Sequence, residues 1–187
     1  SGIQLQRTIM DYAVHSDDYL EVTKKLLALG VNPNAICFKD SSGMVQYPLQ
    51  RALMGKAEKT IALLLASPKI DVRIKNNHGS LLWYATIGFK TPEEILASMR
   101  QLLDAGVDPN TLDCRGQTVL FDIAGNNCGI YPDGVKSAKA KVELLCEYGM
   151  DVNIKNKEGR TAVESIENWY DTETIRNRLH PTYLRYH

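Results

Sequence analysis

The stretch IDVRIKNNHG at Ile70–Gly79 returns as MDVNIKNKEG at Met150–Gly159. A third version, VDPNTLDCRG, lies between them at Val107–Gly116, and a looser fourth, VNPNAICFKDSSG, ends at Gly43. In the first three an Asp stands eight residues before a Gly. Self-similarity at a period of about 20–50 residues is typical of stacked arrays, in which an extended surface carries function more often than a buried catalytic pocket does.

Apolar segments flank each copy. A longer segment, expected to be helical, precedes it and ends in a leucine pair: Leu26 and Leu27, Leu64 and Leu65, Leu102 and Leu103, or Leu144 and Leu145. Gly takes the left-handed conformation that ends a helix without a side-chain clash, and three of these segments are followed by one: Gly30, Gly106 and Gly149. Shorter segments end in Ala13, Ala52, Ala85 and Ala124, at spacings of 39, 33 and 39. Each unit is therefore predicted to be a short helix, a loop and a longer helix, with about 33 residues plus insertions.

Two of the predicted longer helices carry apolar stripes. One consists of Val22, Leu26, Leu27 and Leu29, and the other of Ile95, Met99, Leu102 and Leu103. The second follows i, i+4, i+7, i+8 spacing. A helix pair of this size cannot bury its stripe alone, so neighbouring units must stack to form a core. We therefore expect the stripes to stack on each other.

The junctions carry a family resemblance. Gly106–Asn110 reads GVDPN and residues 150–162 read MDVNIKNKEGRTA. Both resemble the junction of ankyrin repeats, whose pattern is a Gly, an Asp-Val-Asn turn, a Gly and a Thr-Pro-Leu-His-x-Ala first helix. Tyr47–Ala52, YPLQRA, keeps Pro-Leu and a polar residue, but no first helix keeps the family's His. In the family this His supports hydrogen bonds between neighbouring units, so its absence puts that network in doubt but not the fold.

The resemblance covers nearly the whole chain and implies an all-α ankyrin-repeat solenoid. Its helix-turn-helix units would be joined by turns or β-hairpin-like loops. We expect one array over residues 1–187, with the first and last units as caps. The expected units are about 1–34, 35–71, 72–108, 109–151 and 152–187.

Composition argues against several classes of function. The 187 residues are 44% hydrophobic and 24% charged, with zero formal net charge and no basic stripe, so neither nucleic acid nor a membrane is an expected partner. Cys37, Cys114, Cys128 and Cys146 form no Cys-x-x-Cys pair and stand near no histidine pair. We expect reduced thiols, a cytoplasmic monomer, and no metal, cofactor or catalytic residue.

In ankyrin arrays the loop tips and short helices line a concave groove that binds other proteins, and the resemblance transfers this role to matching positions. Trp83 and Tyr84 are consecutive, so one should point away from the side on which the other packs, although both could be wedged between units. Residues 125–134 form an insertion that either binds a partner through Ile130 and Tyr131 or is a tolerated loop. The partner-binding candidates are Lys39, Asp40, Lys75, Asn77, His78, Trp83, Tyr84, Asp113, Arg115, Tyr131 and Lys157.

The sequence therefore favours a non-catalytic protein–protein interaction module. Two alternatives stay open: a targeting or substrate-recruiting domain of a larger enzyme or secreted effector, and a structural spacer in a longer solenoid. Irregular arrays with divergent first helices also resemble those of eukaryote-like effectors that intracellular bacteria deliver into host cells, which would place the chain in host cytosol.

Overall fold

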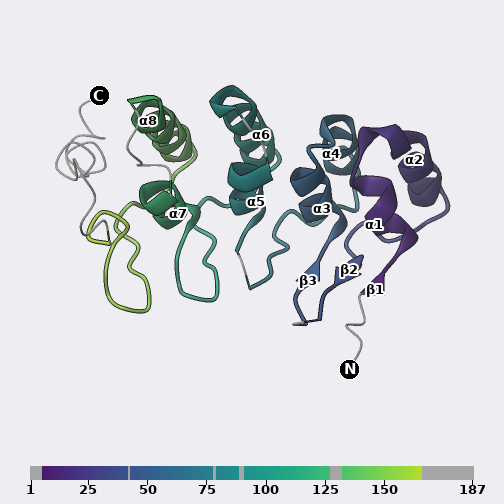
Figure 1. Cartoon of the computed structure of the whole chain (residues 1–187), viewed down its shortest axis with the longest axis horizontal. Coiled ribbons are helices and arrows are strands. Elements are labelled where there is room, and N and C mark those ends of the chain that lie inside the picture. Colours follow the sequence, from purple (N-terminus) through teal and green to yellow (C-terminus); the bar gives the residue numbers. More distant parts are fainter. Residues whose placement is uncertain (1–5, 42, 78, 89–90, 127–131, 166–187) are drawn as a thin grey trace.

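The computed structural model describes residues 6–41, 43–77, 79–88, 91–126 and 132–165. Within them, four helix pairs follow one another in a row along the long axis of the molecule (Figure 1). The pairs are α1 (Ile9–Val14) with α2 (Leu20–Ala28), α3 (Pro48–Gly55) with α4 (Glu58–Leu65), α5 (Leu81–Gly88) with α6 (Pro92–Asp104), and α7 (Val119–Asn126) with α8 (Pro132–Glu147). A 3-10 helix, Asp17–Tyr19, links α1 to α2. The prediction of a mostly helical chain is confirmed.

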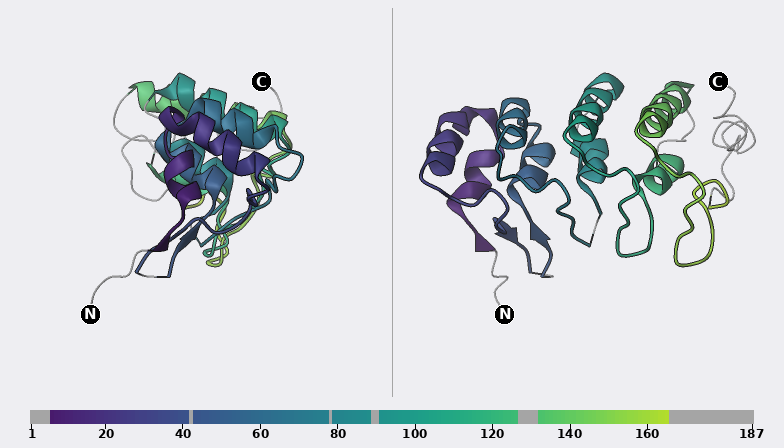
Figure 2. Two further views of the ribbon diagram at one scale, coloured as in Figure 1. Left: turned by 90° about the vertical axis from the view of Figure 1, so that its right-hand side faces the viewer. Right: turned by 180° about the vertical axis from the view of Figure 1, so that it is seen from behind.

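Strands are few in the described residues. Viewed along the row, the helices overlie one another and the loops between pairs project to one side (Figure 2). In the first loop β2 pairs antiparallel with both β1 and β3. The strands are β1 (Gln6–Arg7), β2 (Phe38–Lys39) and β3 (Val45–Gln46). The later loops carry only isolated bridges, Asn76 with Gly79 and Lys155 with Thr161. The expected β-hairpin-like connection is therefore best developed between the first two helix pairs.

Glycines end three of the second helices in the same way. After α6, the N–H of Gly106 donates to the carbonyl of Leu103 at 2.9 Å and the N–H of Val107 to that of Leu102 at 3.1 Å. Gly106 has a φ of 88°, which a side chain would strain. Gly30 and Gly149 close α2 and α8 with equivalent bonds. These helix ends were predicted from the sequence and are confirmed.

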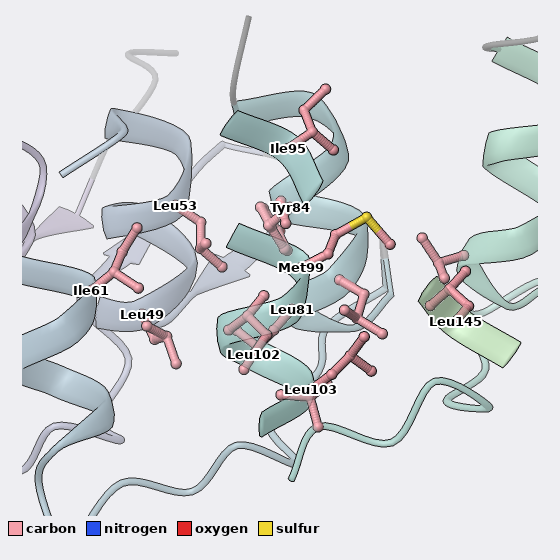
Figure 3. Packing of buried hydrophobic residues seen from close by; sticks show 14 of the residues in the cluster. Leu49, Leu53, Ile61, Leu81, Tyr84, Ile95, Met99, Leu102, Leu103 and Leu145 are labelled. Atoms are coloured by element: carbon pink, nitrogen blue, oxygen red, sulfur yellow. The ribbon is translucent and has the colours of Figure 1, made fainter. Parts of the chain in front are cut away.

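The core lies between the helix pairs (Figure 3). All four members of the predicted α6 stripe are buried, with exposed fractions of 7% or less. They are Ile95, Met99, Leu102 and Leu103. Thr91 begins α6 with a capping box, since its hydroxyl accepts from the Glu94 N–H at 3.2 Å and Glu94 Oε2 accepts from the Thr91 N–H at 3.2 Å. This cap fixes the register in which the stripe faces the core.

The prediction for the first stripe is wrong. Val22 is 42% exposed and Leu29 is 82% exposed, whereas Leu26 and Leu27 are only partly buried. The buried residue of α2 is Thr23, whose hydroxyl donates to the Ala13 carbonyl at 2.9 Å. The physical reason is position: α2 belongs to the first described pair, so no described helix covers its outer side (Figure 1).

Two glycines allow the first helices to approach each other closely. A Cβ on Gly88 of α5 would lie 2.3 Å from the carbonyl oxygen of Leu53 in α3. A Cβ on Gly55 of α3 would lie 1.9 Å from the carbonyl oxygen of His15, which follows α1. Both distances are shorter than any real contact allows, and the obstacle is backbone in each case. The second helix pair is thus packed against the first and the third through backbone contacts.

A buried polar network joins the first two pairs in place of the missing His. Asp11 of α1 is fully buried and accepts a hydrogen bond from Nε of Arg51 in α3. Arg51 also donates from Nη1 to Gln46 Oε1 at 3.2 Å, and its guanidinium lies 4.9 Å from the centre of the Phe38 ring. A buried charge is tolerated only when paired in this manner. The chain therefore links its first units through an ion pair rather than through His.

Side chains of the connecting loops also bridge successive pairs. Asn34 donates to the Lys69 carbonyl at 2.6 Å and accepts from the Asp71 N–H at 2.9 Å. Asn110 makes the equivalent bonds to Gly149 and Asp151, at 3.0 and 2.7 Å. Both asparagines come from the Pro-Asn of a repeat phrase. The phrase that identifies the repeat is thus also a device that ties one unit to the next.

Candidate partner-binding site

The loop tips are closed by short hydrogen-bonded turns, and in the first, third and fourth the side chain of the first residue accepts bonds from backbone N–H groups of the same turn. The four tips are residues 40–44, 76–79, 113–117 and 156–160. In the third, the Asp113 N–H donates to the Gln117 carbonyl at 2.9 Å. Asp113 Oδ1 also accepts from the N–H groups of Arg115 and Gln117, both at 2.8 Å. Asp40 Oδ1 accepts similarly from Met44 at 2.9 Å. Two predicted binding residues, Asp40 and Asp113, therefore shape their own loops.

A hollow of about 420 Å³ lies between the third and fourth helix pairs. We call it the Trp83 hollow. It combines residues of the second tip, α5, the third tip and α7. Its lining consists of Asn77, Trp83, Ile87, Asp113, Cys114, Arg115 and Asp122. Four of these, Asn77, Trp83, Asp113 and Arg115, are among the sequence-predicted residues, which the fold thus brings together.

Trp83 and Tyr84 have different roles. Trp83 is half-buried and lines the hollow, whereas Tyr84 is 1% exposed and lies among core residues (Figure 3). The two rings pack edge to face with centroids 4.9 Å apart. The Tyr84 hydroxyl accepts from Asn76 Nδ2 at 2.7 Å. The expectation that Tyr84 contacts a partner is therefore corrected, because Tyr84 is enclosed between units and supports Trp83 from behind.

Charges of both signs meet in the hollow. Arg115, 57% exposed, pairs through Nε with Asp113 Oδ2 at 2.8 Å and lies with Nη2 3.6 Å from Asp122 Oδ1. The Asp122 side chain is 18% exposed. Burial raises the pKa of Asp122, while the Arg115 charge and a hydrogen bond from Trp83 act in the opposite direction. Asp122 was not among the sequence-predicted residues, although it is a single carboxylate within the apolar run 119–124.

The other predicted residues lie around this region or outside the described chain. Lys39, on β2, is exposed and does not line the hollow. Lys75 is exposed and its Nζ donates to the Leu112 carbonyl at 3.3 Å, and the N–H of exposed Lys157 donates to the Arg115 carbonyl at 3.2 Å. These bonds thus join the second loop to the third and the third to the fourth. His78 and Tyr131 lie outside the described residues.

The insertion predicted at 125–134 is shorter than expected. Gly125 and Asn126 belong to α7, and α8 begins at Pro132. Residues 127–131, including Ile130 and Tyr131, lie outside the described chain. The hypothesis that this segment binds a partner stays a prediction.

A second hollow, of about 300 Å³, lies on the outer side between α6 and α8. The ion pair of Arg100 Nη2 with Glu147 Oε2, at 3.2 Å, spans these two helices. Its lining consists of Leu96, Ala97, Arg100, Ala140, Glu143, Leu144 and Glu147. None of these lining residues was a sequence candidate, and none of them is aromatic.

Three cysteines in the described residues are free thiols. Burial raises the pKa of the Cys37 thiol to about 12, and the neighbouring Asp11 carboxylate adds to the shift. Cys114 is exposed at the third tip and Cys146 is half-buried, both as free thiols.

In the described ranges no three His, Cys, Asp or Glu side chains are placed to hold a metal ion together. No helix in that part of the chain has the length and apolar character needed to cross a bilayer.

Comparison with known proteins fits the stacked helix pairs. No family model matches the chain. It is 26% identical over 165 residues to human (Homo sapiens) Rabankyrin-5, covering 81% of this chain and 14% of that protein. Over 133 residues it is 29% identical to Ankyrin repeat and SOCS box protein 16 of Mus musculus, covering 65% of this chain and 27% of that protein. The chain is therefore similar, at low identity, to ankyrin-repeat proteins. It spans only 14% and 27% of the length of these two curated relatives.

The ankyrin register clarifies what replaces the family's His. The helix starts align Ile123, not Ala124, with the small residues Ala13, Ala52 and Ala85. The position of the His, the third residue of each first helix, is then occupied by Asp11, Gln50, Trp83 and Phe121. The first two are buried polar residues next to the Arg51 network, and the last two are aromatic. At this position the first two helix pairs therefore carry polar side chains, whereas the third and fourth carry aromatic ones.

Proposed function

We propose that the chain is a non-catalytic protein-binding module, built as an ankyrin-repeat solenoid that binds a partner protein along a concave groove of tips and first helices. The Trp83 hollow supports this proposal most strongly. It places a half-buried indole and the 49%-exposed Ile87 of α5 beside an ion-pair cluster formed by the third tip and α7. Interface anchors are typically aromatic or arginine side chains in such pockets, surrounded by a polar rim.

The rim of the proposed groove is polar and of mixed charge. Exposed side chains on or next to the second to fourth tips are Lys75, Asn77, Arg115 and Lys157. We propose that they provide specificity and hydrogen bonds, while Trp83 and Ile87 provide buried area. Asp40 and Asp113 contribute by fixing their loops, and Lys39 would contact only a partner long enough to reach the first tip. The five units, the monomeric state and the cytoplasmic location belong to the same proposal.

A second candidate is a recruiting array within a larger protein. In both relatives described above, the matched segment is a minor part of a longer protein. An array of this kind would bring a partner to an activity located elsewhere in the same protein. It would use the same groove, so its recognition chemistry is tested by the same experiment.

The experiment is a selection for binders on the isolated array. A displayed library of peptides and small domains is selected on the wild-type protein, and the dissociation constants of the binders are measured. Ile87→Glu combined with Arg115→Ala should weaken them by at least about tenfold, because truncated anchors commonly cost about 2 kcal/mol or more. Arg100→Ala, in the outer hollow, is the matched control and should change little. Binders that tolerate the double variant but not Arg100→Ala would refute the proposal.

A further inference from the structure

We propose that the Trp83 hollow accepts an arginine or lysine side chain of the partner, with its charge at the carboxylate of Asp122 and its stem along Trp83 and Ile87. This inference rests on the proposed function and adds the chemistry of the anchoring residue. It follows from the charges, the acceptor capacity and the apolar walls of the hollow.

The lining of the hollow has an excess of negative charge. Asp113 and Asp122 contribute two negative charges and Arg115 contributes one positive charge, which leaves a net charge of −1 (−2 + 1). Lys75 and Lys157 are nearby on the tips, but neither lines the hollow, and Lys75 Nζ is already bonded to the Leu112 carbonyl. A cation entering the hollow therefore meets a complementary charge.

The two carboxylates are not equally available. Asp113 accepts from two backbone N–H groups at 2.8 Å and from Arg115 Nε at 2.8 Å, so its oxygens are occupied. Asp122 accepts a hydrogen bond from Trp83 and has Arg115 Nη2 at 3.6 Å, beyond an ordinary hydrogen bond. A carboxylate has about four lone-pair sites, and Asp122 thus retains acceptor capacity for a second guanidinium or ammonium group. The raised pKa of Asp122 agrees with this acceptor capacity, because burial disfavours its charge more than Arg115 and Trp83 stabilise it.

The apolar walls suit the stem of a long basic side chain. Ile87 is 49% exposed and lies one helical turn after Trp83 on α5. Arginine and lysine bury their methylene groups along such surfaces while their charge reaches a polar group. A guanidinium over an indole face also gains a cation–π interaction. The volume of about 420 Å³ is large enough for one side chain without closure of the loops.

The other classes of anchor fit less well. An acidic side chain would approach Arg115 only beside Asp113 and Asp122, and like charges in contact are unfavourable. A purely apolar anchor would remove more water from the Asp122 carboxylate and leave it without a new partner. The hollow therefore discriminates in favour of a cation.

The test uses the peptides selected on the wild-type array. They should share an arginine or lysine at one position, and its replacement by citrulline, or by norleucine for lysine, should weaken binding by about tenfold or more. Asp122→Asn should produce a similar loss, and Glu93→Gln, on exposed α6 surface, should not. Melting curves of both variants verify that the array is folded.

The outcomes separate the two proposals. Peptides that depend on Ile87 and Arg115 but share an acidic or apolar residue, and that tolerate Asp122→Asn, would overturn the inference and leave the groove as the binding site. Peptides that depend on none of these residues would overturn both. A common basic residue whose effect disappears in Asp122→Asn would support the inference.

Discussion

Replacing Gly88 by alanine should destabilise the array, because α5 touches the backbone of α3 at this residue. The new Cβ would lie 2.3 Å from the Leu53 carbonyl oxygen and 3.0 Å from the carbonyl carbon. These atoms cannot rotate away, so the two helices must separate. Overpacking of this kind costs about 1–3 kcal/mol. The better helix propensity of alanine offsets only about 0.5–1 kcal/mol of that cost.

Gly125→Ala is the matched control, since Gly125 also lies near the end of a first helix, α7, and a Cβ there meets nothing within 4 Å. Both variants share the propensity gain, so their free energies of unfolding should differ by the overpacking cost of about 1–3 kcal/mol. For a chain of this size that is a difference of roughly 2–12 °C in melting temperature. Helical circular dichroism during heating and during urea titration measures it. Equal transitions would refute the close contact between α3 and α5.

Three further predictions concern stability. Leu103→Ala should cost about 2–5 kcal/mol, whereas Leu29→Lys, at a position 82% exposed, should stay within about 0.5 kcal/mol, as measured by urea unfolding. Asp17 caps α4 by accepting from the N–H groups of Lys59 and Thr60, at 3.0 and 2.9 Å, and Asp17→Ala should cost about 0.5–2 kcal/mol at pH 7. Although burial disfavours its charge, these bonds lower the pKa of Asp17, so its stabilisation should be present above its ordinary pKa of 3.8 and disappear as pH falls through the lower folded-state value. The pKa of Asp122 is raised, so its pH dependence is the opposite of that of Asp17: protonated Asp122 stabilises the fold below its ordinary pKa of 3.8, and this stabilisation is lost as pH rises through the folded-state value. Asp122→Asn should therefore melt at or above the wild-type temperature at pH 7.

Local features of the fold could be predicted because neighbouring residues determine them. The helix ends at Gly30, Gly106 and Gly149 depend on a backbone conformation that the local sequence specifies. The α6 stripe follows from helical spacing alone. Exposure of Leu29 could not be predicted in that way, since spacing indicates which side of a helix is apolar but not whether another helix covers it. The Asp11–Arg51 pair joins residues 40 positions apart, a separation that no local pattern reports.

The candidate site was predicted in outline. The family resemblance indicated the tips and first helices, and the fold assembles Asn77, Trp83 and Arg115 around one hollow. The choice between Trp83 and Tyr84 needed the helix orientation, which consecutive aromatic residues do not specify. Asp122 was missed because its importance arises from its contact with Arg115 of the preceding loop, 3.6 Å away. Sequence patterns thus located the surface, and three-dimensional contacts defined its chemistry.

Amide hydrogen exchange of the array with and without a selected binder tests the groove most directly. The proposed function predicts slower exchange at the second and third tips, in particular at residues 76–77 and 114–117, and at the adjoining first turns of α5 and α7. The outer surface of α6 and α8 should exchange at the same rate in both samples. Protection confined to that outer surface, or to residues 127–131, with unchanged exchange at the tips, would contradict binding in the concave groove.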